Sequence, residues 1–203
     1  MAARVTLAAV VLAGALTTAC AKHVSATIER TRVDPAAPLA PPAYEWTARA
    51  AQVPTSILFA VAREESGMPL HGRWVPWPWT LNLAGVPHRF ASQGETCAAL
   101  WRALQRVPSR RIDVGLGQIN LGYYGNRVAT PCDLLNPYLN LLLAAEILHR
   151  FHRIGEDWMV AVGRYHRPAG GAAADQYRRD VANQLAEVLT EAGETTLAKA
   201  SLP

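Results

Sequence analysis

Proline and glycine residues divide this chain into short segments, each with its own apolar stripe. Pro54 stands before one stripe and Gly67 follows it, while the longest stripe begins at Asn136-Pro137 and stops at Gly155. Proline fits the first turn of a helix but not its interior, and glycine commonly ends helices. The residues between these boundaries therefore predict separate short helices, and the break at Pro168 predicts one more after it.

The hydrophobic spacing inside the segments is that of amphipathic helices. Helices are expected over residues 54–66, 92–107, 137–153, 157–165 and 172–192. Four prolines exclude a continuous helix from residues 68–91, where 80–85 is expected to form a short strand and turn. Residues 113–120 are expected to form a tight turn that leads into one helical turn. A chain of 203 residues, 50% of them hydrophobic, suits one compact domain, so the predicted fold class is mainly α with little or no strand.

Residues 1–21 have the pattern of an export signal. Arg4 supplies a positive charge, and the uncharged run from Val5 to Ala19 has the length of a signal-peptide core but is short for a membrane span. Cleavage is predicted either after Ala21 or before Cys20, which would then carry a lipid; an uncleaved anchor is the third alternative. All three place the rest of the chain outside the cytoplasm, in the periplasm, with an outer-membrane lipoprotein as the lipidated form.

The exported part of the chain has three predicted regions. Residues 22–43 contain four prolines and several alanines without hydrophobic periodicity, which indicates an extended tether. Residues 44–168 hold most of the predicted helices and form the predicted domain. Residues 169–203 are expected to add a C-terminal helix and a short tail.

Two cysteines, Cys97 and Cys132, remain once Cys20 is assigned to the export signal. Two thiols in an oxidising compartment allow a single pairing, so a Cys97–Cys132 disulfide is predicted, with two buried free thiols as the alternative. In the chain-entropy model, a bridge over a loop of this length adds about 3–4 kcal/mol to the free energy of unfolding.

Charge and histidine spacing argue against two classes of function. The formal net charge is +4, or +3 without Arg4, and the positive residues are scattered apart from pairs such as Arg110-Arg111. This is a poor nucleic-acid signature, and it suits work near an anionic polymer or lipid. A Glu-x-x-His pattern occurs once, at Glu146 and His149, where di-metal helical bundles need it twice. Neither a metal site nor a cofactor is therefore predicted.

Glu65 is the candidate catalytic group. It precedes Ser66 at the point where the predicted helix 54–66 meets Gly67, so its carboxyl group can project into a cleft. Apolar and aromatic surroundings would raise its pKa, as a general acid at neutral pH requires. A solvated helix cap is the alternative on this evidence alone.

Three further motifs follow Glu65-Ser66-Gly67 along the chain. They are Gly115-Leu116-Gly117-Gln118, Asn136-Pro137-x-x-Asn140 and Ala161-x-x-x-Tyr165-His166. In this order the motifs resemble those of SLT-type lytic transglycosylases, over about residues 44–168. The resemblance implies a goose-type-lysozyme-like helical domain. It also implies cleavage of the β-1,4 bond between N-acetylmuramic acid and N-acetylglucosamine in peptidoglycan, with formation of a 1,6-anhydro end.

The resemblance further implies roles for single residues. Glu65 would be the one catalytic carboxyl group required, because the substrate's own acetamido oxygen would stabilise the oxocarbenium-like transition state. Ser66, Gln118 and Tyr165 would bind the substrate. Asn140 more often holds loops together in such folds and is left out of the site.

Departures from the family pattern leave other functions open. Gly117 stands where the family usually has Met, and His166 where it has Asn; both keep a non-catalytic wall-binding assembly factor in consideration. The 50 positions from Glu65 to Gly115 exceed the commoner spacing and are similar to those of small enzymes that accompany conjugation and secretion systems, which are therefore expected partners besides glycan strands. A hydrolytic muramidase is the other alternative. Asp113 is the one other carboxyl group considered for the site, with a turn or cap role preferred.

Three of the six tryptophans fall within the run Trp74–Trp79. Aromatic faces stack on sugar rings, but tryptophan and proline also pack rigid loops against a core. Structural packing is the preferred interpretation, with one tryptophan facing the groove as an addition to it.

Overall fold

A computed structural model of the chain describes residues 40–200, and side chains up to residue 193. These residues belong to one compact unit, Val33–Pro203. The predicted leader, residues 1–21, and most of the predicted tether, residues 22–43, lie outside the described residues.

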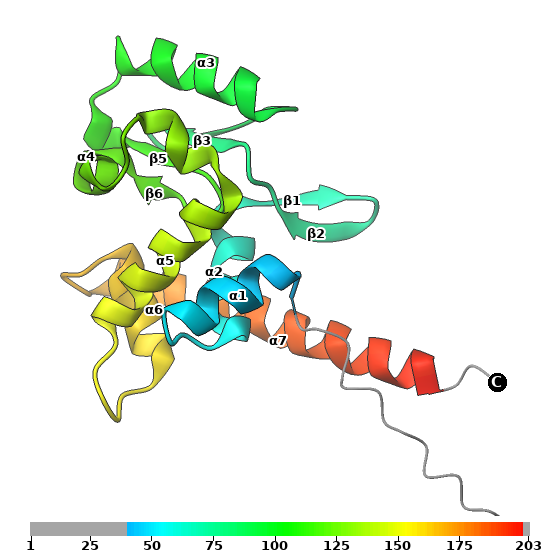
Figure 1. Ribbon diagram of the computed structural model, residues 1–203. Coiled ribbons are helices and arrows are strands. Elements are labelled where there is room, and N and C mark those ends of the chain that lie inside the picture. Colours follow the sequence, from blue (N-terminus) through cyan, green and yellow to red (C-terminus); the bar gives the residue numbers. More distant parts are fainter. Residues whose placement is uncertain (1–39, 201–203) are drawn as a thin grey trace, which may run out of the picture. The chain divides into compact units, whose positions relative to one another are not determined.

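Seven α-helices, six strands and three short 3₁₀ helices make up this described part (Figure 1). The α-helices are α1 Pro42–Ala50, α2 Thr55–Ser66, α3 Gln93–Leu104, α4 Leu121–Tyr124, α5 Pro137–Phe151, α6 Trp158–His166 and α7 Ala172–Ala200. The strands are β1 Gly67–Leu70, β2 Arg73–Pro76, β3 Thr80–Leu83, β4 Val86–Arg89, β5 Ile112–Val114 and β6 Ile119–Asn120. The 3₁₀ helices are η1 Ser109–Arg111, η2 Gly125–Arg127 and η3 Pro131–Leu135.

The predicted mainly α class is confirmed, and the helix starts follow the capping residues. Ser92 accepts a hydrogen bond from the Glu95 amide at the start of α3, and Asn136 accepts from two amides at the start of α5. The first helix, α1, was not expected; it begins at Pro42, two residues before the predicted domain start, and proline fits a first helical turn. The last two residues of the predicted tether are therefore helical.

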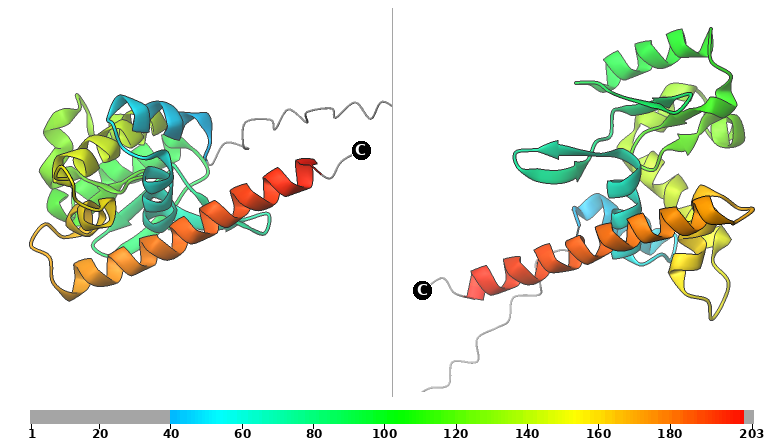
Figure 2. Two further views of the ribbon diagram at one scale, coloured as in Figure 1. Left: turned by 90° about the horizontal axis from the view of Figure 1, so that it is seen from below. Right: turned by 180° about the vertical axis from the view of Figure 1, so that it is seen from behind.

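The expectation of little or no strand is wrong. Residues 68–91 form two antiparallel hairpins, β1–β2 and β3–β4, of which only β3 was expected. Strand β5 pairs with β3, and β6 pairs with β5, so a four-stranded sheet has the order β4-β3-β5-β6. The prolines that exclude a helix here fit short strands at sheet edges. Figure 2 shows the β1–β2 hairpin beside α7, where Arg73 of β2 pairs with Glu191 of α7 at 3.5 Å.

The core lies among α1, α2 and α5, with α7 packed along α2 and α6 (Figures 1 and 2). Helix α5 supplies six buried aliphatic side chains, among them Leu141, Ala144 and Leu148. Helix α7 presents an apolar stripe that includes Tyr177 and Val181. No helix among the described residues is long and apolar enough to cross a membrane.

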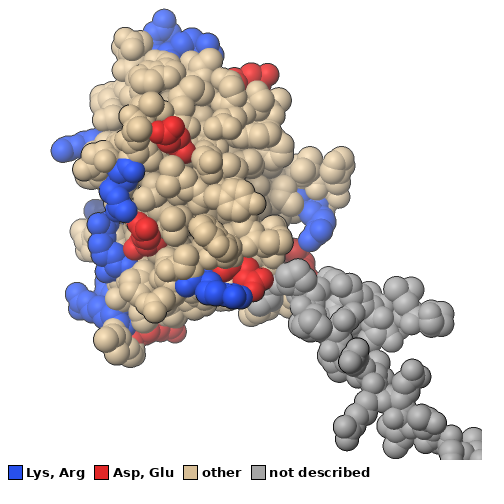
Figure 3. Space-filling view, in the orientation of Figure 1, with Lys and Arg blue, Asp and Glu red and all other residues tan. Residues whose placement is uncertain are grey.

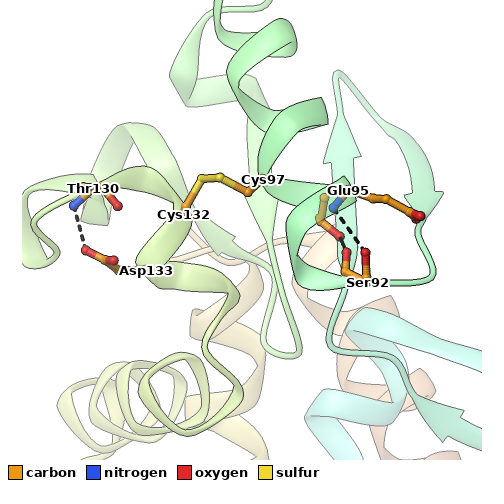
Figure 4. The surroundings of a disulfide bond; sticks show 7 residues. Ser92, Glu95, Cys97, Thr130, Cys132 and Asp133 are labelled. Carbon is orange, nitrogen blue, oxygen red and sulfur yellow. Dashed lines mark hydrogen bonds between the residues drawn. A yellow bond between two sulfur atoms is a disulfide. The ribbon is translucent and has the colours of Figure 1, made fainter.

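The Cys97–Cys132 disulfide is present. It joins α3 to η3, with a Cα–Cα distance of 5.3 Å (Figure 4). Both ends are also fixed by caps, Ser92 at α3 and Thr130 with Asp133 at η3. The bridge therefore ties together two short helices that each also supply buried core residues, Leu100 from α3 and Leu134 from η3.

Candidate functional site

A cavity of about 740 Å³ brings together residues that are far apart in the sequence. Its partly buried polar side chains come from the end of α2, from β3, β5, β6 and the turn between β5 and β6, from α4 and from α6. They are Glu65, Asn82, Asp113, Gln118, Asn120, Tyr124 and Tyr165. Its exposed side chains include Tyr123, Arg150, His166 and Arg167. Three of the four residues predicted for the site, Glu65, Gln118 and Tyr165, thus line one cavity.

Glu65 is the last residue but one of α2, and it lines this cavity. The pKa of Glu65 is raised to about 8, mainly by burial and also by the nearby carboxyl groups of Asp113 and Glu64, against a hydrogen bond that lowers it. The Glu65 side chain is therefore mostly protonated at neutral pH. A protonated carboxyl group facing a cavity is a general acid in position.

The hydrogen bond that opposes this shift comes from Tyr177, a residue that was not predicted for the site. Its hydroxyl donates to Oε1 of Glu65 at 2.6 Å, from the buried face of α7. The ring of Tyr177 stacks on His166, with ring centroids 4.5 Å apart and planes 8° apart. The one sequence signal for Tyr177 is its place on the apolar stripe of the predicted helix 172–192. A buried tyrosine hydroxyl usually has a hydrogen-bond partner, but the stripe does not show which residue that partner is.

Ser66 does not line the cavity. It is fully buried, and its hydroxyl bonds the backbone carbonyl oxygens of Ala62, at 3.0 Å, and Leu116, at 2.9 Å. The second bond ties the end of α2 to the turn between β5 and β6. In this structure Ser66 holds the turn beside Glu65 rather than facing a ligand.

Asn140 fixes the same turn from α5, as expected for a residue that holds loops together. Its amide nitrogen donates to the carbonyl oxygens of Val114 and Leu134, both at 2.8 Å, and its Oδ1 accepts from the Gly117 amide at 2.8 Å. Asn140 is 1% exposed, so all three bonds lie in the core. Gly115, with φ of +81°, allows this close approach, because a Cβ there would lie 2.3 Å from the Asn140 amide nitrogen.

Gly117, which stands where SLT-type enzymes usually have Met, has no room for a side chain in this structure. A Cβ on Gly117 would lie 2.6 Å from the Ala144 Cβ and 3.0 Å from the Tyr165 hydroxyl. The missing side chain would therefore point into the packing against α5, and Gly117 itself is buried beneath the cavity. The Tyr165 hydroxyl donates to the Gly117 carbonyl oxygen at 2.5 Å, so close packing at Gly117 positions Tyr165.

Gln118 and Tyr165 line the cavity, and each forms a side-chain hydrogen bond to a backbone carbonyl oxygen of the turn between β5 and β6. The Gln118 side-chain amide donates to the Gly115 carbonyl oxygen at 2.8 Å, which closes the turn. Burial, with the nearby charge of Glu65, raises the pKa of Tyr165, so its hydroxyl stays protonated. Both residues thus present fixed side chains next to Glu65.

Asp113 is a second carboxyl group in the cavity. Its Oδ1 accepts a 2.8 Å hydrogen bond from the side-chain amide of Asn120. Burial raises the pKa of Asp113, while the Asn120 bond and His166 lower it. The preferred turn or cap role does not account for this position, since Asn120, not Asp113, caps α4.

The tryptophans of the run Trp74–Trp79 do not line this cavity. The Trp74 indole donates to the Arg63 carbonyl oxygen at 3.0 Å, and the Trp77 indole to that of Phe90 at 2.7 Å. Trp77 packs edge-on against Trp79. The Trp74 indole thus fastens the β1–β2 hairpin to α2, and the Trp77 indole fastens the link between the two hairpins to the residue after β4, which agrees with the packing interpretation.

No protein-family model matches this chain, and no curated protein or solved structure matches it either. Within residues 40–193, no cluster of three or more histidine, cysteine, aspartate or glutamate side chains is arranged to hold a metal ion.

Proposed function

We propose that this chain is a peptidoglycan lytic transglycosylase with a lysozyme-like (SLT) catalytic domain. The observation that carries the proposal is a protonated carboxyl group, Glu65, at a helix end in a cavity large enough for sugar rings. The order of the four motifs, which resembles that of SLT-type enzymes, supports it. So does the convergence of Gln118 and Tyr165 on the same cavity.

The proposed reaction uses one protein carboxyl group twice. Glu65 donates its proton to the glycosidic oxygen between N-acetylmuramic acid and N-acetylglucosamine as that bond breaks. The acetamido oxygen of the substrate stabilises the positive charge that develops at C1. The Glu65 carboxylate then accepts the proton of the C6 hydroxyl as O6 bonds to C1, which leaves a 1,6-anhydro end and a regenerated acid.

The surroundings of Glu65 support both halves of this cycle. Burial favours the protonated form that the first step needs. The Tyr177 hydroxyl donates to the carboxylate that the first step leaves, which favours the ionised form that the second step needs. A group poised between the two forms near neutral pH serves as acid and then as base.

A hydrolytic muramidase is a second candidate, and Asp113 is the observation that favours it. Asp113 shares the cavity with Glu65, and two carboxyl groups are the usual equipment of glycosidases that use water. Its products would carry a reducing end, heavier by one water than the anhydro form.

For the cellular setting, we propose export by the N-terminal leader and local opening of the wall in the periplasm, for a secretion or conjugation apparatus. The export pattern of residues 1–21 and the long spacing between Glu65 and Gly115 support this.

The test is digestion of purified sacculi by the wild type, by Glu65→Gln and by Glu64→Gln, with zymography and mass analysis of the products. Glu64 is the matched control, because it is the neighbouring carboxyl group on α2 and does not line the cavity. Anhydro products from the wild type and from Glu64→Gln, and none from Glu65→Gln, are expected. Cleavage by Glu65→Gln would overturn the assignment of the acid, and water-containing products would favour the muramidase.

A further inference from the structure

Two arginines that line the cavity, Arg150 and Arg167, form no ion pair with a carboxylate among the described residues, unlike two arginines near them. Arg127 and Arg164, which do not line the cavity, are paired with the carboxylates of Glu146 and Glu156. Among the ion pairs of the described residues, neither Arg150 nor Arg167 takes part. Both are exposed and both line the cavity.

Arg150 is held in place without being neutralised. Its Nη2 donates to the Tyr124 hydroxyl at 2.8 Å, and its guanidinium lies 5.5 Å from the Tyr124 ring centroid and 5.6 Å from that of Phe151. A guanidinium carries five N–H donors, so this leaves most of them for another acceptor. An arginine oriented by aromatic rings is suited to binding a carboxylate.

Arg167 lies directly after α6 and lines the same cavity. Its positive charge acts on His166, whose pKa is lowered first by burial and then by Arg167. The cavity therefore combines two partly buried carboxyl groups, Glu65 and Asp113, with two cations among its exposed residues. Figure 3 shows lysine and arginine side chains along the left edge of the visible face, with others at its top, bottom and right.

We propose that Arg150 and Arg167 form a subsite that binds a carboxylate of the substrate. The substrate class is then a glycan whose 3-O-lactyl substituent carries a free carboxylate, either directly or through an attached peptide. This rests on the proposed function and narrows it. The carboxylate has two sources: the lactyl group itself on strands without peptide, or the stem peptide attached to it. Glycans of N-acetylglucosamine alone carry neither.

The test measures binding to a Glu65→Gln background, so that no substrate is consumed. Four soluble probes of equal glycan length are titrated by calorimetry: peptide-bearing strands, peptide-free strands with a free lactyl carboxylate, the same strands with that carboxylate amidated, and chitooligosaccharides. The variant is Arg150→Gln with Arg167→Gln. The matched control is Arg102→Gln with Arg106→Gln, which removes the same charge from exposed positions outside the cavity.

The cavity double variant is expected to bind the carboxylate probes about tenfold more weakly than the Glu65→Gln background does. Its affinity for the neutral probes, and the affinity of the control variant for all probes, are expected to be unchanged. A loss confined to peptide-bearing strands assigns the carboxylate to the stem peptide, and a loss confined to peptide-free strands assigns it to the lactyl group. A loss with both anionic probes shows that the subsite accepts either carboxylate. Equal binding of anionic and neutral probes, or an equal loss in the control variant, overturns the subsite. Absence of binding by every probe would count against the proposed function instead.

Discussion

The hydroxyl of Tyr177 donates a 2.6 Å hydrogen bond to Oε1 of Glu65, across 112 positions of sequence. Helix α7 therefore completes the site that α2 begins. A second attachment holds the two helices in register: the buried guanidinium of Arg63 bonds Gln184, Glu187 and Glu191 of α7. Arg63 is 1% exposed, so removing its partners would leave a buried charge unpaired. The region after residue 168 is thus part of the site's framework.

Replacing Tyr177 by Phe is expected to move the alkaline limit of activity to higher pH. Activity requires protonated Glu65, whose pKa is about 8, so the rate falls as the pH rises through that value. The Tyr177 bond lowers the pKa of Glu65, and its loss therefore raises it. The maximal rate is expected to fall about tenfold, because the ionised form loses a charge-assisted hydrogen bond. The measurement is the pH–rate profile on sacculi, with Tyr138→Phe, an exposed tyrosine, as the control.

Replacing Asp113 by Asn is expected to shift the same limit in the opposite direction. The Asp113 carboxylate raises the pKa of Glu65, so a neutral amide of the same shape lowers it. The side-chain oxygen of Asn can still accept the bond from Asn120. A pH–rate profile that moves to higher pH, or stays in place, would contradict the electrostatic coupling of the two carboxyl groups. Loss of all turnover would give Asp113 a direct chemical role.

Replacing Gly117 by Ala is expected to lower the free energy of unfolding by about 1–3 kcal/mol, as overpacking a core does. The added Cβ meets Ala144 at 2.6 Å and pushes on the Tyr165 hydroxyl. Urea unfolding measures the effect. Gly94→Ala is the control, because nothing lies within 4 Å of a Cβ at that position of α3, and alanine favours helices. Equal free energies of unfolding for the two variants would show that the close packing at Gly117 does not contribute to stability.

Removing the disulfide by changing both Cys97 and Cys132 to Ala is expected to cost about 3–4 kcal/mol of unfolding free energy. Reduction of the wild type by dithiothreitol should produce a similar loss and leave the double variant unaffected. Unchanged stability after reduction would show that the bridge does not constrain the unfolded chain.

Helices α2, α3, α5, α6 and α7 were predictable because their boundaries are local. Asn136-Pro137 starts α5 and Asp157 caps α6 through bonds within a few residues. The four-stranded sheet was missed because a strand needs a partner, and the pairing of Leu81 in β3 with Val114 in β5 joins segments that no local pattern connects.

The site was predicted where a motif marked it and missed where only packing creates it. Glu65, Gln118 and Tyr165 belong to the recognised motifs, and they line the cavity. Ser66 also belongs to one, but the motif does not reveal that the Ser66 hydroxyl bonds backbone carbonyl oxygens in the core. Tyr177 belongs to a plain amphipathic helix, so nothing in its neighbourhood points to Glu65.

The proposed reaction depends most on the protonation state of Glu65, and a carbon-13 NMR titration of the glutamate side-chain carboxyl groups measures it directly. The Glu65 resonance is assigned as the one that disappears in Glu65→Gln. A midpoint near pH 8 is expected for that resonance, mainly because the carboxyl group is buried. A midpoint near the ordinary value of 4.5 would contradict the proposed reaction, because Glu65 would then be ionised at neutral pH and unable to donate a proton to a glycosidic oxygen.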